Sequence, residues 1–113
     1  MSENKCLLVL CNTPDLETAS RIARQLVEER LAACVNMLPE VRSVYHWQGK
    51  IEEAAEVPLL VKTTQLAYPR LERRLQELHP YEVPEIVAWD IAAGLPAYLT
   101  WVAGETVSSP DEA

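Results

Sequence analysis

Glycine is scarce in this chain, which has three glycines among 113 residues, at positions 49, 94 and 104. A glycine-rich loop that could cradle phosphate is therefore absent. The sequence also contains neither a His-x-x-x-His pair nor a nucleophile elbow. A Cys–His pair could act only if the fold brought the two residues together. Catalysis thus finds little support, and we expect a protein that is not an enzyme.

Positive charge and long apolar runs are also lacking. Ten Lys and Arg residues face 17 Asp and Glu residues, and the formal net charge is -7. The phosphate backbone of a nucleic acid would be repelled, so we expect no nucleic-acid partner. No run approaches the roughly 20 apolar residues of a membrane span. The first residues do not resemble a signal peptide. These features predict a cytoplasmic protein that does not associate with membranes.

The three cysteines form no CxxC motif, which favours reduced thiols over a disulfide framework. Hydrophobic residues make up 49% of the chain and charged residues 24%, the balance of a soluble globular protein. A chain of this length suits one domain, spanning residues 1–113. The polar residues 105–113 are expected to form a mobile tail.

Apolar periodicity predicts the order β-α-β-β-α-β followed by a short helix. Thr13 is the expected cap of the first helix, with Pro14 in its first turn. This order is the split βαβ arrangement of a ferredoxin-like α+β fold, with an antiparallel sheet and both helices on one face. The expected elements are a strand at 5–12, a helix from 13 to about 30, a strand at 33–38, a hairpin at 41–64, a helix at about 68–79, a strand at 85–91 and a helix at 95–102.

The hairpin is the most informative stretch. Its arms flank Gln48-Gly49-Lys50, and the second arm is much longer than the usual strand of about 5–6 residues. An exposed strand edge invites association, so the ribbon is expected to reach a neighbouring copy of the chain. On the first arm, alternation places Val41, Ser43, Tyr45 and Trp47 on one face.

Several motifs together resemble one family, the CutA proteins, which are named for divalent-cation tolerance. These motifs are Thr13-Pro-Asp15, Leu31-Ala-Ala-Cys34, Tyr45-His-Trp-Gln-Gly-Lys50, Glu56 with Leu60-Val-Lys-Thr-Thr64, and His79-Pro-Tyr-Glu-Val-Pro-Glu85. The resemblance implies a ferredoxin-like protomer in a compact homotrimer, with the long hairpin packed between subunits. It also implies an architecture akin to the PII signalling proteins, which bind effectors in clefts between subunits.

The resemblance further implies copper binding, by a cysteine at the end of the first strand and by two adjacent histidines before Pro-Tyr. The matching positions here are Cys11, Leu78 and His79, so Leu78 replaces one expected ligand. Copper favours thiolate and imidazole donors, and Cys34 is a third candidate ligand. In the alternative interpretation the cysteines are small core residues and His79 caps a helix. Copper is not expected to be required for folding.

A second candidate site combines Tyr45, Trp47 and Tyr81 with Lys62. Aromatic rings and a lysine suit a cleft for an anionic or planar ligand. The same rings could instead pack in a trimer interface. Glu56 lies on the same face of its strand as Lys62, about 20 Å away, so the two cannot pair with each other within one arm but could meet partners from another subunit.

The sequence thus predicts a non-enzymatic homotrimer associated with the binding and tolerance of divalent metal ions, copper in particular. Two alternatives stay open. One is a PII-like module that binds a small effector between subunits, and the other is a structural assembly scaffold.

Overall fold

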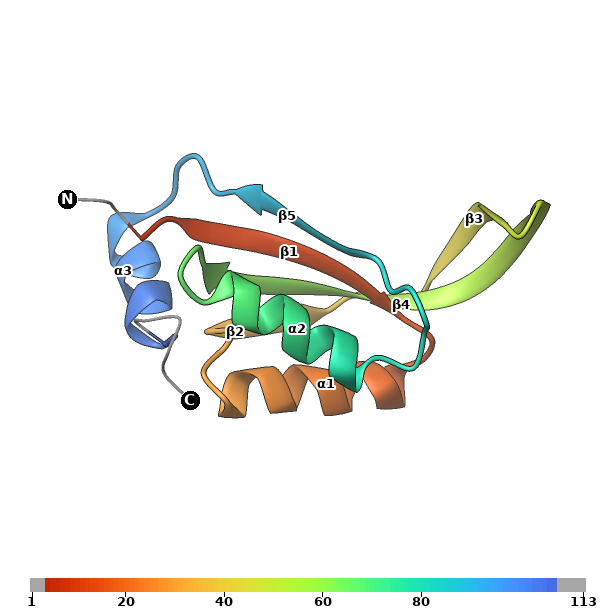
Figure 1. The fold of residues 1–113 in the computed structure, drawn as a ribbon. Coiled ribbons are helices and arrows are strands. Elements are labelled where there is room, and N and C mark those ends of the chain that lie inside the picture. The colour runs from red at the N-terminus through yellow and green to blue at the C-terminus, as the bar shows by residue number, and fades with distance from the viewer. Residues whose placement is uncertain (1–3, 108–113) are drawn as a thin grey trace.

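The computed structural model describes residues 4–107, and its elements follow the predicted order (Figure 1). The fold is α+β and ferredoxin-like, with one antiparallel five-stranded sheet. Its elements are β1 (Cys6–Thr13), α1 (Leu16–Glu28), β2 (Cys34–Met37), β3 (Val41–Trp47), β4 (Lys50–Thr64), α2 (Tyr68–Leu78), β5 (Ile86–Asp90) and α3 (Pro96–Gly104). None of the helices in these residues is both long enough and apolar enough to cross a membrane.

Strand β4 organises the sheet because it pairs with three others. Its second half, 57–64, pairs with β1, and β2 pairs with 59–62 of the same half. Its first half, 50–56, pairs only with β3 and extends beyond the body of the molecule as a ribbon (Figure 1). The long second arm predicted from the sequence is therefore one strand of 15 residues that belongs to both the body and the ribbon.

The ribbon turns through two residues. Trp47 pairs with Lys50, and Gln48 and Gly49 between them have φ values of 50° and 80°. Two positive φ values are typical of a type I′ turn, whose twist matches that of the flanking strands. Gly49 takes this conformation without the steric cost that a side chain would bring.

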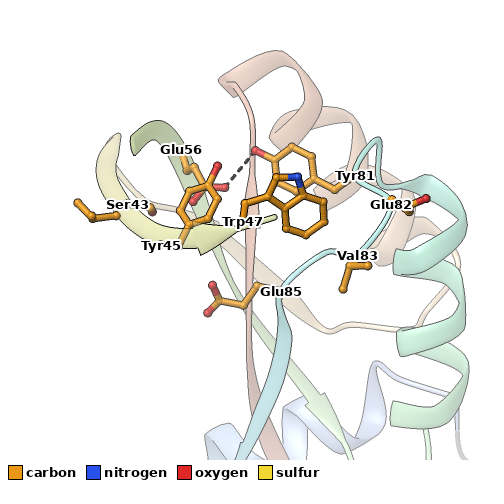
Figure 2. A pocket seen from close by; sticks show the side chains of 9 residues that line it. Ser43, Tyr45, Trp47, Glu56, Tyr81, Glu82, Val83 and Glu85 are labelled. Carbon is orange, nitrogen blue, oxygen red and sulfur yellow. Dashed lines mark hydrogen bonds between the residues drawn. The ribbon is translucent and has the colours of Figure 1, made fainter. Parts of the chain in front are cut away.

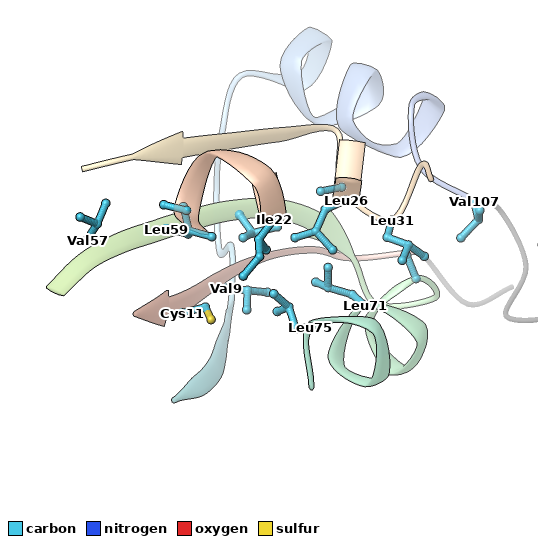
Figure 3. Packing of buried hydrophobic residues seen from close by; sticks show 14 residues of the cluster. Val9, Cys11, Ile22, Leu26, Leu31, Val57, Leu59, Leu71, Leu75 and Val107 are labelled. Atoms are coloured by element: carbon cyan, nitrogen blue, oxygen red, sulfur yellow. The ribbon is translucent and has the colours of Figure 1, made fainter. Parts of the chain in front are cut away.

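The hydrophobic core lies between the sheet and the helix pair α1 and α2, which cover the same face (Figures 1 and 3). Apolar residues at helical spacing on α1 and α2 meet the inward residues of β1 and β4. The central, fully buried members are Val9, Ile22, Leu26, Leu59, Val61, Leu71 and Leu75.

The other face of the sheet carries no helix along most of its length. Helix α3 covers one end of it, where Val102 packs with Cys6 and Ala33. Beyond α3, alternation in the register leaves a row of apolar side chains on this face. We call this surface the open face and define it by Leu8, Leu10, Leu60, Val87 and Trp89.

Two local predictions at the ends of α1 are wrong. Asp15, not Thr13, caps the helix, and its carboxylate accepts a 2.7 Å hydrogen bond from the Thr18 N–H. The Thr13 hydroxyl turns into the sheet instead, where it donates to the Val57 carbonyl at 2.7 Å. The helix ends at Glu28 rather than near residue 30, because Arg30 adopts the left-handed conformation with φ 57°.

Residues 105–107, predicted as the start of a mobile polar tail, are packed against the body instead. Thr106 and Val107 are buried, and Val107 packs in the main core. The Val107 N–H donates to the Arg30 carbonyl at 2.9 Å, which ties this segment to the end of α1. The remainder of the predicted tail, 108–113, lies outside the described residues.

Candidate functional site

A chain of hydrogen bonds lies where the ribbon leaves the body. The His79 Nε2 atom lies 2.6 Å from the Asn12 carbonyl oxygen, and the Tyr81 N–H donates to His79 Nδ1 at 3.1 Å. The Tyr81 hydroxyl donates to Glu56 at 3.0 Å. The Asn12 side-chain amide donates to Glu85, also at 3.0 Å. Five residues from three parts of the chain thus form one network.

Local sequence explains how His79 reaches this network. It is the residue after α2, and its backbone is extended because Pro80 follows. The chain then turns back, so that the rings of His79 and Tyr81 lie 4.6 Å apart. Because Nδ1 accepts from the Tyr81 N–H, Nε2 must carry the proton donated to Asn12. Both nitrogens of the imidazole are therefore engaged.

A pocket of about 700 Å³ opens beside the network, between the ribbon and the loop that precedes β5 (Figure 2). The rings of Tyr45, Trp47 and Tyr81 line it. Its other lining residues are Ser43, Val44, Glu56, Glu82, Val83 and Glu85. The charged side chains in this set are all carboxylates, so we call it the acidic pocket. Carboxylates beside aromatic faces favour a cation rather than an anion.

Tyr81 stays a hydrogen-bond donor under physiological conditions. Burial raises its pKa to about 12, and the hydrogen bond to Glu56 with the charge of that carboxylate adds to the effect. Glu56 itself is only 7% exposed. A buried carboxylate needs such a partner, because an unpaired one would be costly. The Tyr81–Glu56 contact thus holds one wall of the acidic pocket in place.

Cys11 and His79 both approach the Asn12 carbonyl oxygen, from which the Cys11 Sγ atom lies 3.9 Å and the His79 Nε2 atom 2.6 Å. The arrangement does not suit copper, however. Both His79 nitrogens are occupied, and Cys11 is fully buried in the core (Figure 3). Burial raises the pKa of the Cys11 thiol to about 12, with smaller contributions from the charges of Glu85 and Glu56. Metal ligation needs the thiolate, which is therefore disfavoured here.

Cys34 cannot complete that site. It pairs with Lys62, which in turn pairs with Leu8, so Cys34 belongs to the side of the sheet opposite Cys11. It lies beside Tyr98 of α3, whose pKa is raised by burial first and by Cys34 second. Within residues 4–107, no three His, Cys, Asp or Glu side chains converge in a way that could hold a metal ion.

Lys62 also lies apart from the aromatic residues with which it was grouped. Its ammonium group donates to the Asn36 side-chain carbonyl on β2, and it does not line the acidic pocket. Within one protomer Lys62 and the three rings therefore share no pocket, and a cleft that they form between subunits stays a prediction. The reason is the path of the loop before β5, which brings Glu82 and Glu85 to the pocket in place of a lysine.

The pH dependence of stability follows from Cys11. Its folded pKa of about 12 exceeds its ordinary value of 9.0, so the protonated thiol stabilises the fold fully below about pH 9. That contribution is lost as the pH rises from 9 towards 12, with a slope of at most about 1.4 kcal/mol per pH unit. Urea unfolding should show that the free energy of unfolding falls more between about pH 8 and about pH 10 in the wild type than in Cys11→Ala. An equal fall in the two proteins would contradict a raised pKa of the Cys11 thiol as the cause.

The topology, the extended hairpin and the terminal helix define a class of small ferredoxin-like proteins that carry a ribbon beyond the sheet. Residues 7–105 match the family described as CutA1 divalent ion tolerance protein. The chain belongs to this family, which is non-enzymatic.

Individual relatives agree with this assignment. The divalent-cation tolerance protein CutA of Thermus thermophilus is 54% identical over 99 residues, which cover 88% of this chain and 96% of the relative. A solved structure from the same species, described as a divalent cation tolerance protein, superimposes with a TM-score of 0.89 at 52% identity, covering 90% of this chain and 99% of that one. Protein CutA of Mus musculus is 47% identical over 79% of this chain, and the match covers only 50% of the mouse protein.

Proposed function

We propose that this protein is a cytoplasmic homotrimer that binds divalent cations, copper among them, and so serves divalent-cation tolerance. The observation that carries the proposal is the acidic pocket. Glu56, Glu82 and Glu85 line it without a balancing lysine or arginine. Oxygen donors are weaker copper ligands than thiolate or imidazole, but Cu²⁺ still ranks highest among the first-row divalent ions at a given site.

A second copy of the chain would complete the cation's coordination. Three carboxylates line the pocket, yet no three donors converge in the described residues 4–107. One wall of the pocket is the ribbon, which extends away from the body and leaves Val44 and Ile51 largely exposed. Packing of this ribbon against another subunit would bring further donors towards the pocket and exclude water from it.

The trimer is supported by the open face. Val87 and Trp89 are 43% and 51% exposed in the single chain, and they sit opposite Leu10 and Leu8 of β1. A contiguous apolar surface of this kind marks a site of protein association. The family's trimeric assembly, implied by the resemblance, would cover it.

Calorimetric titration of the reduced, oxygen-free protein with Cu²⁺ tests the cation site. A parallel titration with Zn²⁺ avoids thiol oxidation, since zinc has no redox chemistry. Glu56→Gln and Glu82→Gln should each weaken binding about tenfold, the equivalent of one lost charge-assisted contact. Cys11→Ser should change the affinity by less than about twofold, because its thiol is protonated and buried.

Glu17→Gln is the matched control, since Glu17 is an exposed carboxylate on α1, away from the acidic pocket. It should bind as the wild type does. If Cys11→Ser and His79→Ala abolish binding while both pocket variants keep it, the copper site predicted from the family resemblance would be correct and the acidic pocket would not be the cation site.

The aromatic lining favours a second candidate function, a PII-like module for a small effector. Three rings with carboxylates suit a planar cation better than the anion expected from Lys62. This candidate predicts weak binding of metal ions in the same titration, and tight, saturable binding of an organic cation that Trp47→Ala removes.

A further inference from the structure

A second pocket, of about 480 Å³, lies on the helical side of the molecule. Helices α1 and α2 run antiparallel (Figure 1), so the end of α1 lies beside the first half of α2. Four of the chain's seven arginines line this pocket: Arg30, Arg70, Arg73 and Arg74. We call it the arginine pocket. In a chain with net charge -7, such a concentration of guanidinium groups is unexpected.

Two of these arginines are neutralised by carboxylates. Arg74 forms a bidentate pair with Glu29, in which Nε and Nη2 each donate to a different carboxylate oxygen at 3.0 Å, and it also contacts Glu77 at 3.3 Å. Arg30 lies 3.6 Å from Glu105. These pairs explain how the two side chains are held, and they leave little capacity for a ligand at Arg74.

The other two arginines, Arg70 and Arg73, form no ion pair within residues 4–107. The Arg70 Nη1 atom is buried, and it is the one buried side-chain polar atom in that part of the chain without a hydrogen-bond partner. A buried cationic donor without an acceptor is costly, so native structures rarely leave one without a reason. One remaining glutamate of the lining, Glu28, is not paired with either arginine.

We propose that the arginine pocket binds a small oxyanion with two or more negative charges, of the phosphate type. Guanidinium groups match the oxygens of phosphate by paired, charge-assisted hydrogen bonds. Arg70 and Arg73 lie in the first half of α2, where the helix dipole also favours an anion. The volume suits a small phosphorylated molecule rather than a macromolecule. This site is separate from the acidic pocket, so its test is independent of the proposed cation function.

Pyrophosphate is a suitable probe, titrated into the full-length protein in low-salt, metal-free buffer and followed by calorimetry. The wild type should bind it saturably, and Arg70→Gln and Arg73→Gln should each weaken binding about tenfold. Arg24→Gln is the matched control, because Arg24 is exposed on α1 and does not line the pocket. It should change the affinity less than about twofold.

Stability separates loss of binding from loss of fold. Arg70→Gln removes a guanidinium whose buried Nη1 atom has no hydrogen-bond partner, so it should not lower the midpoint of thermal unfolding. Pyrophosphate should raise the midpoint of the wild type but not that of Arg70→Gln. No saturable binding up to about 10 mM, or equal weakening by Arg24→Gln, would overturn the proposal.

The chain itself contains one rival occupant. Asp111 and Glu112 follow Val107, a residue of the pocket lining, by four and five positions in the sequence. An Asp111→Asn/Glu112→Gln variant with wild-type affinity for pyrophosphate would support an external oxyanion. An increase of about tenfold or more would show that the chain's own carboxylates compete for the same arginines, which would also support an oxyanion site there.

Discussion

Cys11 should react with iodoacetamide about a thousandfold more slowly in the folded protein than in the unfolded chain. Alkylation requires the thiolate, and a pKa raised from 9.0 to about 12 reduces the thiolate fraction by roughly that factor. The complete burial of Cys11 slows the reaction further. The measurement uses a Cys6→Ser/Cys34→Ser variant at about pH 8, with and without urea, and detects the adduct by mass spectrometry.

The converse variant, Cys6→Ser/Cys11→Ala, retains only Cys34 and provides the comparison. Cys34 is partly exposed, so its reaction should be much faster than that of Cys11. If Cys11 reacts as fast as Cys34 in the folded protein, its thiol is accessible. Cys11 could then serve as a thiolate ligand after all.

Trp89→Asp is expected to convert the proposed trimer into monomers. Light scattering of the wild type at micromolar concentration should give three times the mass of one chain, which is 12.7 kDa. The variant should give the mass of a single chain. Trp89 is 51% exposed in the protomer, so the charge is tolerated there. In the assembly the same charge would be buried on the open face without a partner, which costs several kcal/mol per subunit.

Leu16→Asp is the control for this experiment. Leu16 is 62% exposed on the helical side, and it starts α1, where an acidic side chain suits the helix dipole. This variant should remain trimeric. A wild type with the mass of one chain, or a Trp89→Asp variant that stays trimeric, would contradict the assignment of the open face to the subunit interface.

The fold could be predicted because its signals are local. Apolar residues at a spacing of about 3.6 or 2 define the helices and strands, and Gly49 and Pro80 set their limits. The wrong cap shows where such signals fail. Thr13 and Asp15 are both acceptable caps, and the choice depends on the distant Val57 carbonyl that attracts the Thr13 hydroxyl.

The candidate site was harder to predict because it depends on tertiary contacts. The sequence indicated Tyr45, Trp47, Glu56 and Tyr81, which do line one pocket. It could not indicate the Asn12 carbonyl oxygen, because every residue has such an atom and only the fold brings His79 to this one. Lys62 was grouped with the aromatic residues by chemistry alone, and the strand carries it to another part of the sheet.

Part of the arginine pocket has a signal in the sequence. Arg70, Arg73 and Arg74 recur at the spacing of one helix face, which can be read directly from the sequence. The spacing in the sequence does not show that these three arginines lie near Arg30. It depends on the left-handed residue that ends α1 and on the antiparallel packing of the two helices.

The continuity of β4 limits how this protein can change in evolution. Side chains alternate between the two sides of a strand, so inserting one residue near Glu56 would reverse every position of the ribbon relative to the body. Tyr45 and Trp47 would then face away from Tyr81. Insertions in the ribbon that persist in evolution should therefore occur at the Gln48-Gly49 turn and add one residue to each arm. Single insertions near the body should be eliminated by selection.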